Sequence, residues 1–174
     1  MCENNHNTTK AADKIKVIPY EERYLHDFIR LNRAWLEDFG LLEEADEKKH
    51  FNNPRESIID KGGQIFFAIE REIVVGTCAA IRYSSKIIEI AKLAVTPSAQ
   101  GRGIGRMLTK TVTEYSKNVG ALKVILVSST KLKSALRLYE SMGFVHAPLP
   151  EKMDYATADV YMELILFDPV PLNP

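Results

Sequence analysis

Apolar residues along this chain follow two different spacings, which predicts a fold that mixes strands and helices. Short apolar runs that end at turn-forming or polar residues are typical of strands. Seven such runs predict strands at residues 14–18, 64–70, 73–83, 87–95, 122–128, 144–147 and 158–167. A short polar turn separates the second run from the third, and this arrangement predicts a β-hairpin.

Longer segments repeat apolar residues near the 3.6-residue period of an α-helix. The first begins at Tyr20 and ends at Gly40, and two more cover residues 104–119 and 132–142. Each of the three is followed by a glycine, which favours the left-handed conformation that ends many helices. Residues 54–61 predict a further, short helix.

The order of these elements predicts the topology of the sheet. Strands that are neighbours in the sequence can pair antiparallel, but the strand–helix–strand unit from residue 87 to residue 128 needs a parallel crossover. The expected fold class is therefore α+β, with a mostly antiparallel seven-stranded sheet, one parallel pair and flanking helices.

Length and charge limit the number of domains and the classes of binding partner that we expect. A chain of 174 residues fits one domain, which we place at residues 14–174, after a polar tail at residues 1–13 that we expect to be disordered. The 23 basic residues balance the 23 acidic ones, so no global field favours nucleic acid or an anionic membrane. No stretch approaches the ~18 apolar residues that span a bilayer, and no secretory signal is visible, so we expect a soluble, cytoplasmic protein.

The cysteines and histidines suggest little chemistry of their own. Cys2 lies in the polar tail and Cys78 in an apolar run, so neither a disulfide framework nor a metal site is expected. We expect Cys78 to be a buried, inert thiol rather than a nucleophile. His26, His50 and His146 are isolated from one another in the sequence, and we expect them on the surface.

Residues 100–105, Gln-Gly-Arg-Gly-Ile-Gly, separate the fourth predicted strand from the following helix. Glycines leave backbone N–H groups uncovered, and the N-terminus of a helix attracts phosphate. Arg102 and Arg106 add positive charge, so the segment predicts a site for a pyrophosphate group. A dinucleotide loop would need glycine at Arg106, and a Walker loop would need Gly-Lys-Ser/Thr, so neither pattern fits.

The order Gln-x-x-Gly-x-Gly after Leu-Ala-Val-Thr-Pro resembles the acetyl-CoA loop of the GCN5-related N-acetyltransferases (GNAT superfamily). The run from Ala135 to Phe144, with Leu-Tyr and Gly-Phe inside it, resembles the second signature of that family. The resemblance implies acetyl-CoA as cosubstrate, no metal, and a sheet that splays between strands 87–95 and 122–128. The cofactor-binding residues that it implies are Leu93, Ala94, Val95, Gln100, Gly101, Arg102, Gly103, Ile104, Gly105, Arg106, Ser129 and Tyr139.

The same resemblance implies that an acetyl group passes directly to an amine in a ternary complex. It implies an oxyanion donor on the backbone near Val95 and a general acid at Tyr139. Glu89 is the candidate general base, with the alternative that its side chain only faces out of the sheet. Ser129 stands where many members of the family carry Asn. Whether Ser129 makes the hydrogen bond to cofactor or substrate that the longer Asn side chain would make is an open question. A non-catalytic acyl-CoA-binding sensor or subunit is the alternative function.

The acceptor is expected to be a small-molecule or peptide amine, and the family also makes a homodimer possible. An acidic stretch at residues 37–47 suits a cationic amine, or it is simply a solvated loop. Trp35, Tyr83 and Tyr155 could wall an acceptor pocket, although core packing is the expectation for Trp35 and Tyr83. Three basic residues early in the last helix could meet the 3′-phosphate of CoA or form a solvated face: Lys131, Lys133 and Arg137.

Overall fold

The structure, a computed structural model, describes residues 14–44, 50–151 and 155–167. The tail at residues 1–13, with Cys2, lies outside the described residues, as does the end of the acidic stretch at residues 45–47.

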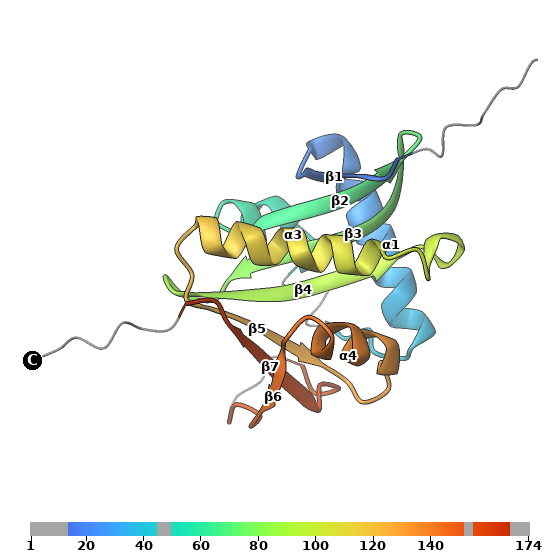
Figure 1. The fold of residues 1–174 in the computed structure, drawn as a ribbon. Helices are drawn as coiled ribbons and strands as arrows, with labels where there is room; N and C mark the ends of the chain where they lie inside the picture. Colours follow the sequence, from blue (N-terminus) through green and yellow to red (C-terminus); the bar gives the residue numbers. More distant parts are fainter. Residues whose placement is uncertain (1–13, 45–49, 152–154, 168–174) are drawn as a thin grey trace, which may run out of the picture.

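One seven-stranded sheet contains the strands of the described residues (Figure 1). Their bounds are β1 Lys16–Pro19, β2 Gln64–Glu70, β3 Ile73–Arg82, β4 Ile87–Val95, β5 Lys123–Ser128, β6 Val145–Ala147 and β7 Val160–Ile165. The strand order is β1-β2-β3-β4-β5-β7-β6, and every neighbouring pair is antiparallel except β4 with β5. This arrangement confirms the predicted fold class.

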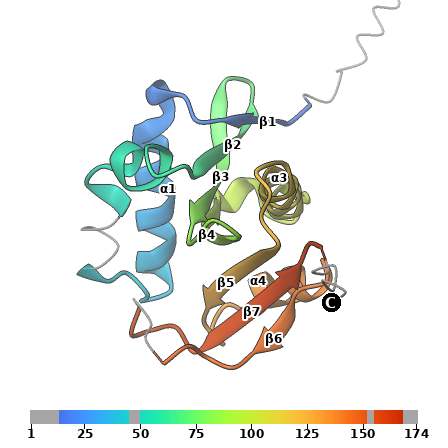
Figure 2. The same cartoon turned by 90° about the vertical axis from the view of Figure 1, so that its left-hand side faces the viewer.

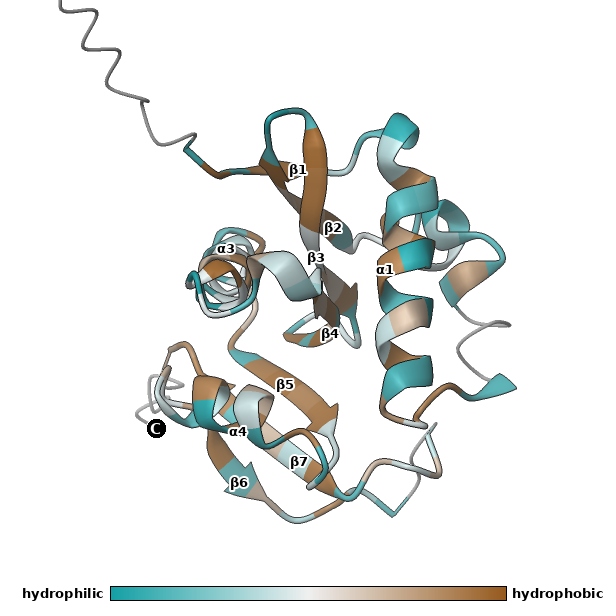
Figure 3. Cartoon of the chain, turned by 90° about the vertical axis from the view of Figure 1, so that its right-hand side faces the viewer, coloured by the Kyte–Doolittle hydropathy of each residue, from teal (hydrophilic) through white to brown (hydrophobic). Residues whose placement is uncertain are grey.

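Helices cover both faces of the sheet. The longer ones are α1 Leu25–Asp38, α3 Ile104–Asn118 and α4 Lys133–Glu140, and the short turns are η1 Glu22–Tyr24, η3 Arg55–Ile59 and η4 Pro97–Ala99. Figure 2 shows α1 on one side of strands β2 to β4 and α3 on the other. Figure 3 shows the apolar strands lying between helices whose outward surfaces are largely polar, which is the amphipathic pattern of the sequence in three dimensions.

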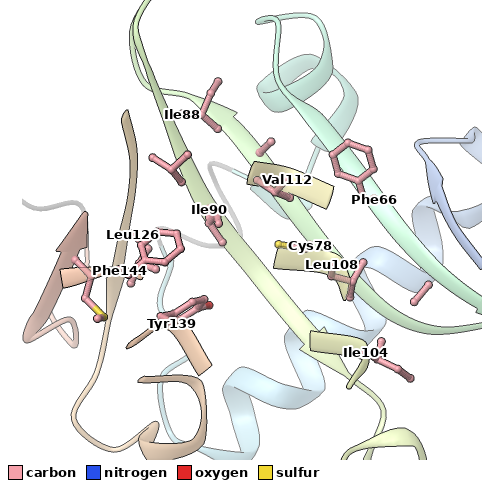
Figure 4. Close-up of a cluster of buried hydrophobic side chains, with 14 of the residues drawn as sticks. Phe66, Cys78, Ile88, Ile90, Ile104, Leu108, Val112, Leu126, Tyr139 and Phe144 are labelled. Atoms are coloured by element: carbon pink, nitrogen blue, oxygen red, sulfur yellow. The ribbon is translucent and has the colours of Figure 1, made fainter. Parts of the chain in front are cut away.

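Two apolar cores follow from this layering. On the α1 face, Phe28 packs with Phe67 and neighbouring residues of β2 and β3. On the α3 face, Leu108 and Val112 pack with residues of β3 to β5, among them Ile90 (Figure 4). Burying each such side chain contributes about 1.5–3 kcal/mol, which fixes the helices on the sheet.

The parallel pair β4–β5 is very short. Its register joins only Ile87–Glu89 with residues 123–125, so the two strands part beyond Glu89. Hydrogen bonding between the strands stops there, and the space between them is available to other groups. The splay that the sequence predicted between these strands is thus confirmed.

Strand β4 also carries a bulge in its second half. Ala91 pairs with Ala79, whereas Ala94 pairs with Thr77, so β4 has one residue more than β3 across this interval. Lys92 lies inside it and has a φ of 54°, in the left-handed region that a non-glycine residue seldom adopts. A bulge of this kind turns successive side chains to one face of the sheet.

Two local details differ from the sequence-based expectation. Pro19, expected to end the first strand, is the last residue of β1, and it fits because β1 pairs only with β2 at the edge of the sheet. The short helix expected at residues 54–61 is a π-helical turn over Arg55–Ile59.

Candidate active site

The glycine loop begins at the end of β4 and leads into α3. Gly101 and Gly103 have φ values of 75° and 79°, and a Cβ atom added to either would meet no atom within 4 Å. Gly103 is the N-cap of α3, whose first turn has no side-chain cap. The uncapped N–H groups and the positive end of the helix dipole therefore border open space, as a phosphate site requires.

The side chains around the loop have different partners. Gln100 donates from Nε2 to the carbonyl oxygen of Val95 at 3.1 Å, which ties the loop to the end of β4. Arg102 turns away and forms a bidentate pair with Glu70, at 2.5 and 3.0 Å. Arg106 donates to the hydroxyl of Ser141 on the far side, at 2.6 Å.

A surface groove of about 390 Å³ runs beside this loop, and we call it the loop groove. Its lining comes from α1, β4, the glycine loop and α4: Trp35, Phe39, Leu93, Val95, Ala99, Gln100, Gly101, Gly103, Ile104, Gly105, Arg106, Leu132, Ser134, Ala135 and Leu138. Arg102 and Ala94, both predicted to bind the cofactor, do not line it. The loop groove thus collects most of the predicted phosphate-binding residues.

A second space of about 120 Å³ lies where β4 and β5 part, and we call it the splay cavity. It is lined by Asn32, Trp35, Leu36, Leu41, Glu89, Ile90, Ala91, Lys92, Leu93, Val127, Ser128, Ser129, Leu132, Ala135, Tyr139, Tyr155, Thr157 and Ala158. The two spaces share four lining residues, Trp35, Leu93, Leu132 and Ala135. One wall therefore serves both, and a long ligand could extend from the loop groove into the splay cavity.

Tyr139 forms part of the splay cavity and is 6% exposed. Its ring packs against Phe144, with the centroids 5.7 Å apart, and Figure 4 shows its hydroxyl directed toward β4. Burial raises the pKa of the Tyr139 phenol well above its ordinary value, and nearby Cys78 adds to this effect. The hydroxyl therefore stays protonated at neutral pH and can act as a proton donor inside the molecule.

Glu89 is the last residue of β4 that pairs with β5. Its neighbours Ile88 and Ile90 belong to the α3-side core, so its side chain points to the opposite face, where it lines the splay cavity. The structure thus brings Glu89 and Tyr139 to one cavity. The Glu89 carboxylate lies at the point where β4 and β5 begin to separate.

Ser129 is 4% exposed and lines the splay cavity just after β5. Its neighbour Thr130 donates to Asp159 from the backbone N–H at 2.7 Å and from the hydroxyl at 2.6 Å. These bonds, with a further one from the Ser129 hydroxyl, hold the pKa of Asp159 below its ordinary value. A charged Asp159 therefore fixes the turn that carries Ser129 toward α4, a role that the sequence did not reveal.

Two further residues contact the lining of the splay cavity: Lys92, which the sequence did not suggest, and Glu43, which belongs to the acidic stretch at residues 37–47. Lys92 Nζ lies 3.4 Å from the Tyr155 hydroxyl and 5.3 Å from the centroid of the Phe51 ring. Glu43 accepts hydrogen bonds from Thr157, from both its N–H at 2.8 Å and its hydroxyl at 2.6 Å. The interruption of an apolar strand by a charge, the signal used for Glu89, could have identified Lys92 as well.

Glu43 holds the loop before β7 against the segment after α1. Burial alone would raise its pKa, but hydrogen bonds from Thr157 and Ala156, together with the charge of Lys92, outweigh this effect and lower the pKa. The carboxylate is therefore charged at neutral pH and fixes the loop that carries Tyr155 and Thr157 to the splay cavity.

Several expectations need correction. Tyr83 is 64% exposed and lines neither space, because it lies just beyond the end of β3. Trp35 packs against the α1-side core, as expected, but it is only partly buried and also lines both spaces. His50, expected on the surface, is 8% exposed, because it precedes Phe51 of the α1-side core.

The remaining candidate residues line neither the loop groove nor the splay cavity. His26 and His146 are exposed as expected, and His146 lies 3.0 Å from Glu140. Cys78 is fully buried, and burial raises the pKa of its thiol, as expected for an inert cysteine. Three basic residues, for which a 3′-phosphate contact and a solvated face were the alternatives, are exposed and line neither space: Lys131, Lys133 and Arg137.

Neither a metal cluster nor a membrane span is found in the part of the chain that the structure describes. Within those residues, no group of three or more His, Cys, Asp or Glu side chains could hold a metal ion. The described helices are all too short or too polar to cross a lipid bilayer.

The sequence that forms the loop groove is matched by a protein-family model. The model of the acetyltransferase (GNAT) family matches residues 25–144, more than half of the chain. The chain belongs to this family. The matched range contains both the glycine loop and the Ala135–Phe144 motif.

Curated relatives agree with this assignment. An uncharacterised N-acetyltransferase of Schizosaccharomyces pombe is 27% identical over 137 residues, covering 72% of this chain and 83% of the relative. N-acetyltransferase 8B of Rattus norvegicus is 33% identical over 90 residues, or 49% of this chain and 40% of the rat protein. The chain therefore matches less than half of the rat relative's length.

Solved structures share the fold at low identity. A GNAT-family acetyltransferase of Staphylococcus aureus Mu50 superposes with a TM-score of 0.79 and 22% identity, covering 88% of this chain and all of that one. A Salmonella typhimurium acetyltransferase, solved with its cofactor acetyl-CoA, gives a TM-score of 0.72 and 18% identity over 92% of this chain and 98% of its own. Both confirm the fold.

Proposed function

We propose that this GNAT-family protein is an N-acetyltransferase that passes the acetyl group of acetyl-CoA directly to a primary amine of a small molecule or peptide. The observation that carries the proposal is the shared wall between the loop groove and the splay cavity. A pyrophosphate held at the glycine loop would let the rest of the cofactor reach the splay cavity, where Glu89 and Tyr139 lie.

The cofactor assignment has independent support. The loop offers backbone N–H groups and an uncapped helix N-terminus, which bind anions without a metal. The Salmonella neighbour was solved with acetyl-CoA, and an N-acetyltransferase of Thermoplasma acidophilum was solved with coenzyme A. We assign the pyrophosphate to the loop amides and to Arg106, and the acyl end to the splay between β4 and β5.

The proposed chemistry needs three groups. A neutral amine nitrogen attacks the thioester carbonyl carbon, and backbone N–H groups of the β4 bulge near Val95 stabilise the oxyanion. The C–S bond then breaks, the N–C bond of the amide remains, and the sulfur takes a proton from the Tyr139 hydroxyl. Glu89 receives the proton that the amine releases, directly or through water.

The site also fits an acyl-CoA-binding protein that performs no transfer, and turnover separates the two functions. We expect purified protein to release CoA thiol from acetyl-CoA in the presence of an acceptor, and to add one acetyl group to that amine. Amino acids, simple amines, polyamines, aminoglycosides and lysine peptides form the test panel. Tight acetyl-CoA binding without transfer to any of them would favour the binding protein.

A further inference from the structure

Lys92 brings a positive charge to a wall of the splay cavity that is otherwise mostly apolar. Strand β4 bulges at Lys92, and the bulge turns the Lys92 side chain to the α1 side of the sheet. There its ammonium lies over the ring of Phe51, a residue of the α1-side core. Its ammonium lies 4.9 Å from the centroid of the Tyr155 ring and 5.3 Å from that of Phe51. The two rings hold the charge in place through cation–π contacts.

The backbone conformation at Lys92 is costly. A non-glycine residue in the left-handed region is strained, and such positions persist where the surrounding structure enforces them. The lysine is thus held by strand, bulge and two aromatic rings at a defined place. An ammonium carries three N–H donors, so it can contact the rings and a ligand together.

Two carboxylates near Lys92, those of Glu43 and Glu89, have different surroundings. Glu43 lies within electrostatic range of Lys92, but its oxygens accept hydrogen bonds from Thr157 and Ala156, which makes it an anchor for the loop. Glu89 lies three residues before Lys92 and lines the same cavity. The two side chains therefore bring opposite charges to one space, as a ligand with both an amine and a carboxylate requires.

We infer that the acceptor carries a carboxylate as well as its amine, and that Lys92 determines this specificity by binding the carboxylate. This inference rests on the proposed function. The acceptor is then a free amino acid or a close analogue, with its amine directed toward Glu89 and the thioester. Polyamines and aminoglycosides, which bring further positive charge, are poor acceptors because they meet Lys92.

The test compares an amino acid with its decarboxylated counterpart. Leucine and 3-methylbutylamine share a side chain and an amine, so the ratio of their kcat/KM values reports the carboxylate alone. We expect the wild-type ratio to favour leucine, and Lys92→Met to lower the ratio about thirtyfold, as for loss of a charged hydrogen bond. The amine basicities cancel when ratios are compared between variants.

Two control variants separate recognition from structure. Lys92→Arg keeps the charge and should retain most of the preference. Arg33→Met removes another cation beside Phe51, whose ring lies 5.9 Å away, but Arg33 does not line the splay cavity, so the ratio should stay constant. Equal losses for both substrates in Lys92→Met, or a wild-type preference for the amine, would overturn the inference while leaving the acetyltransferase function intact. Transfer to no amine at all would refute both.

Discussion

The loop groove and the splay cavity share a wall but offer different kinds of chemical group to a ligand. The loop groove offers backbone N–H groups that one short segment, Gly101 to Arg106, supplies. The splay cavity depends on side chains that four separate parts of the chain bring together, from α1, β4, the β5–α4 region and the loop before β7. In the proposed function, the anion-binding part of cofactor recognition is therefore local, whereas acceptor recognition and chemistry depend on the tertiary fold.

The largest effect should come from filling the loop groove. Gly103→Val places a branched side chain in the left-handed region and in the open space beside the loop amides. We expect acetyl-CoA affinity to fall about 100-fold by calorimetry, because the side chain occupies the anion site.

Gly120 provides the matched control at the other end of α3. It has a φ of 76° and open space around its Cβ position, but it lines neither the loop groove nor the splay cavity. Gly120→Val should lose a similar stability, about 1–2 kcal/mol, and keep normal affinity. Equal loss of affinity in both variants would show that strain, and not the site, explains the result.

Removing the proposed general acid should affect turnover and leave cofactor binding alone. Tyr139→Phe keeps the packing against Phe144, and we expect kcat to fall about 100-fold with unchanged acetyl-CoA affinity. Since burial raises the pKa of this phenol, wild-type kcat should show no loss from its ionisation up to about pH 10. Tyr115→Phe, which removes a hydroxyl bonded to Gly62, is the control and should retain activity.

Glu89→Gln tests the proposed general base. We expect kcat/KM to fall about tenfold to thirtyfold at pH 7 and to recover as the pH approaches the pKa of the amine, because a neutral amine no longer needs the base. A pH–rate profile of the variant against the wild type measures this directly. A constant ratio at every pH would assign Glu89 to the alternative role, a side chain that only packs at the apex of the splay.

The smallest effect concerns the loop before β7. Glu43→Gln weakens the hydrogen bonds to Thr157, so we expect the acceptor KM to rise about fivefold while acetyl-CoA affinity stays constant. The folded-state pKa of Glu43 is lowered, so its contribution is complete above the unfolded value of about 4.3 and is lost as the pH falls through the folded value. The difference in Tm between wild type and variant should therefore shrink below about pH 4. A pH-independent difference would contradict this role.

The contrast between the two spaces also explains what could be predicted from the sequence. The glycine loop and the Ala135–Phe144 motif are local patterns, and both family and fold followed from them. A charge within an apolar strand singled out Glu89, but it left two alternatives open, a general base and a side chain that only faces out of the sheet. The bulge at Lys92 could not be predicted, because it depends on the register between β3 and β4.

Side-chain contacts between residues far apart in the sequence could not be predicted either, because they also depend on the tertiary fold. Arg102 was assigned to the pyrophosphate from its place in the loop, but the β2–β3 hairpin brings Glu70 beside it. The Glu43–Thr157 contact joins residues far apart in the chain and leaves no local pattern. Such contacts depend on how elements pack, which the spacing of residues does not specify.

A crystal structure with CoA bound tests the central claim, that the loop groove and the splay cavity form one continuous site, most directly. We predict the pyrophosphate on the N–H groups of residues 101–106 and the sulfur between β4 and β5, within hydrogen-bond distance of the Tyr139 hydroxyl. A CoA molecule whose sulfur lies outside the splay, away from Tyr139 and Glu89, would contradict the account.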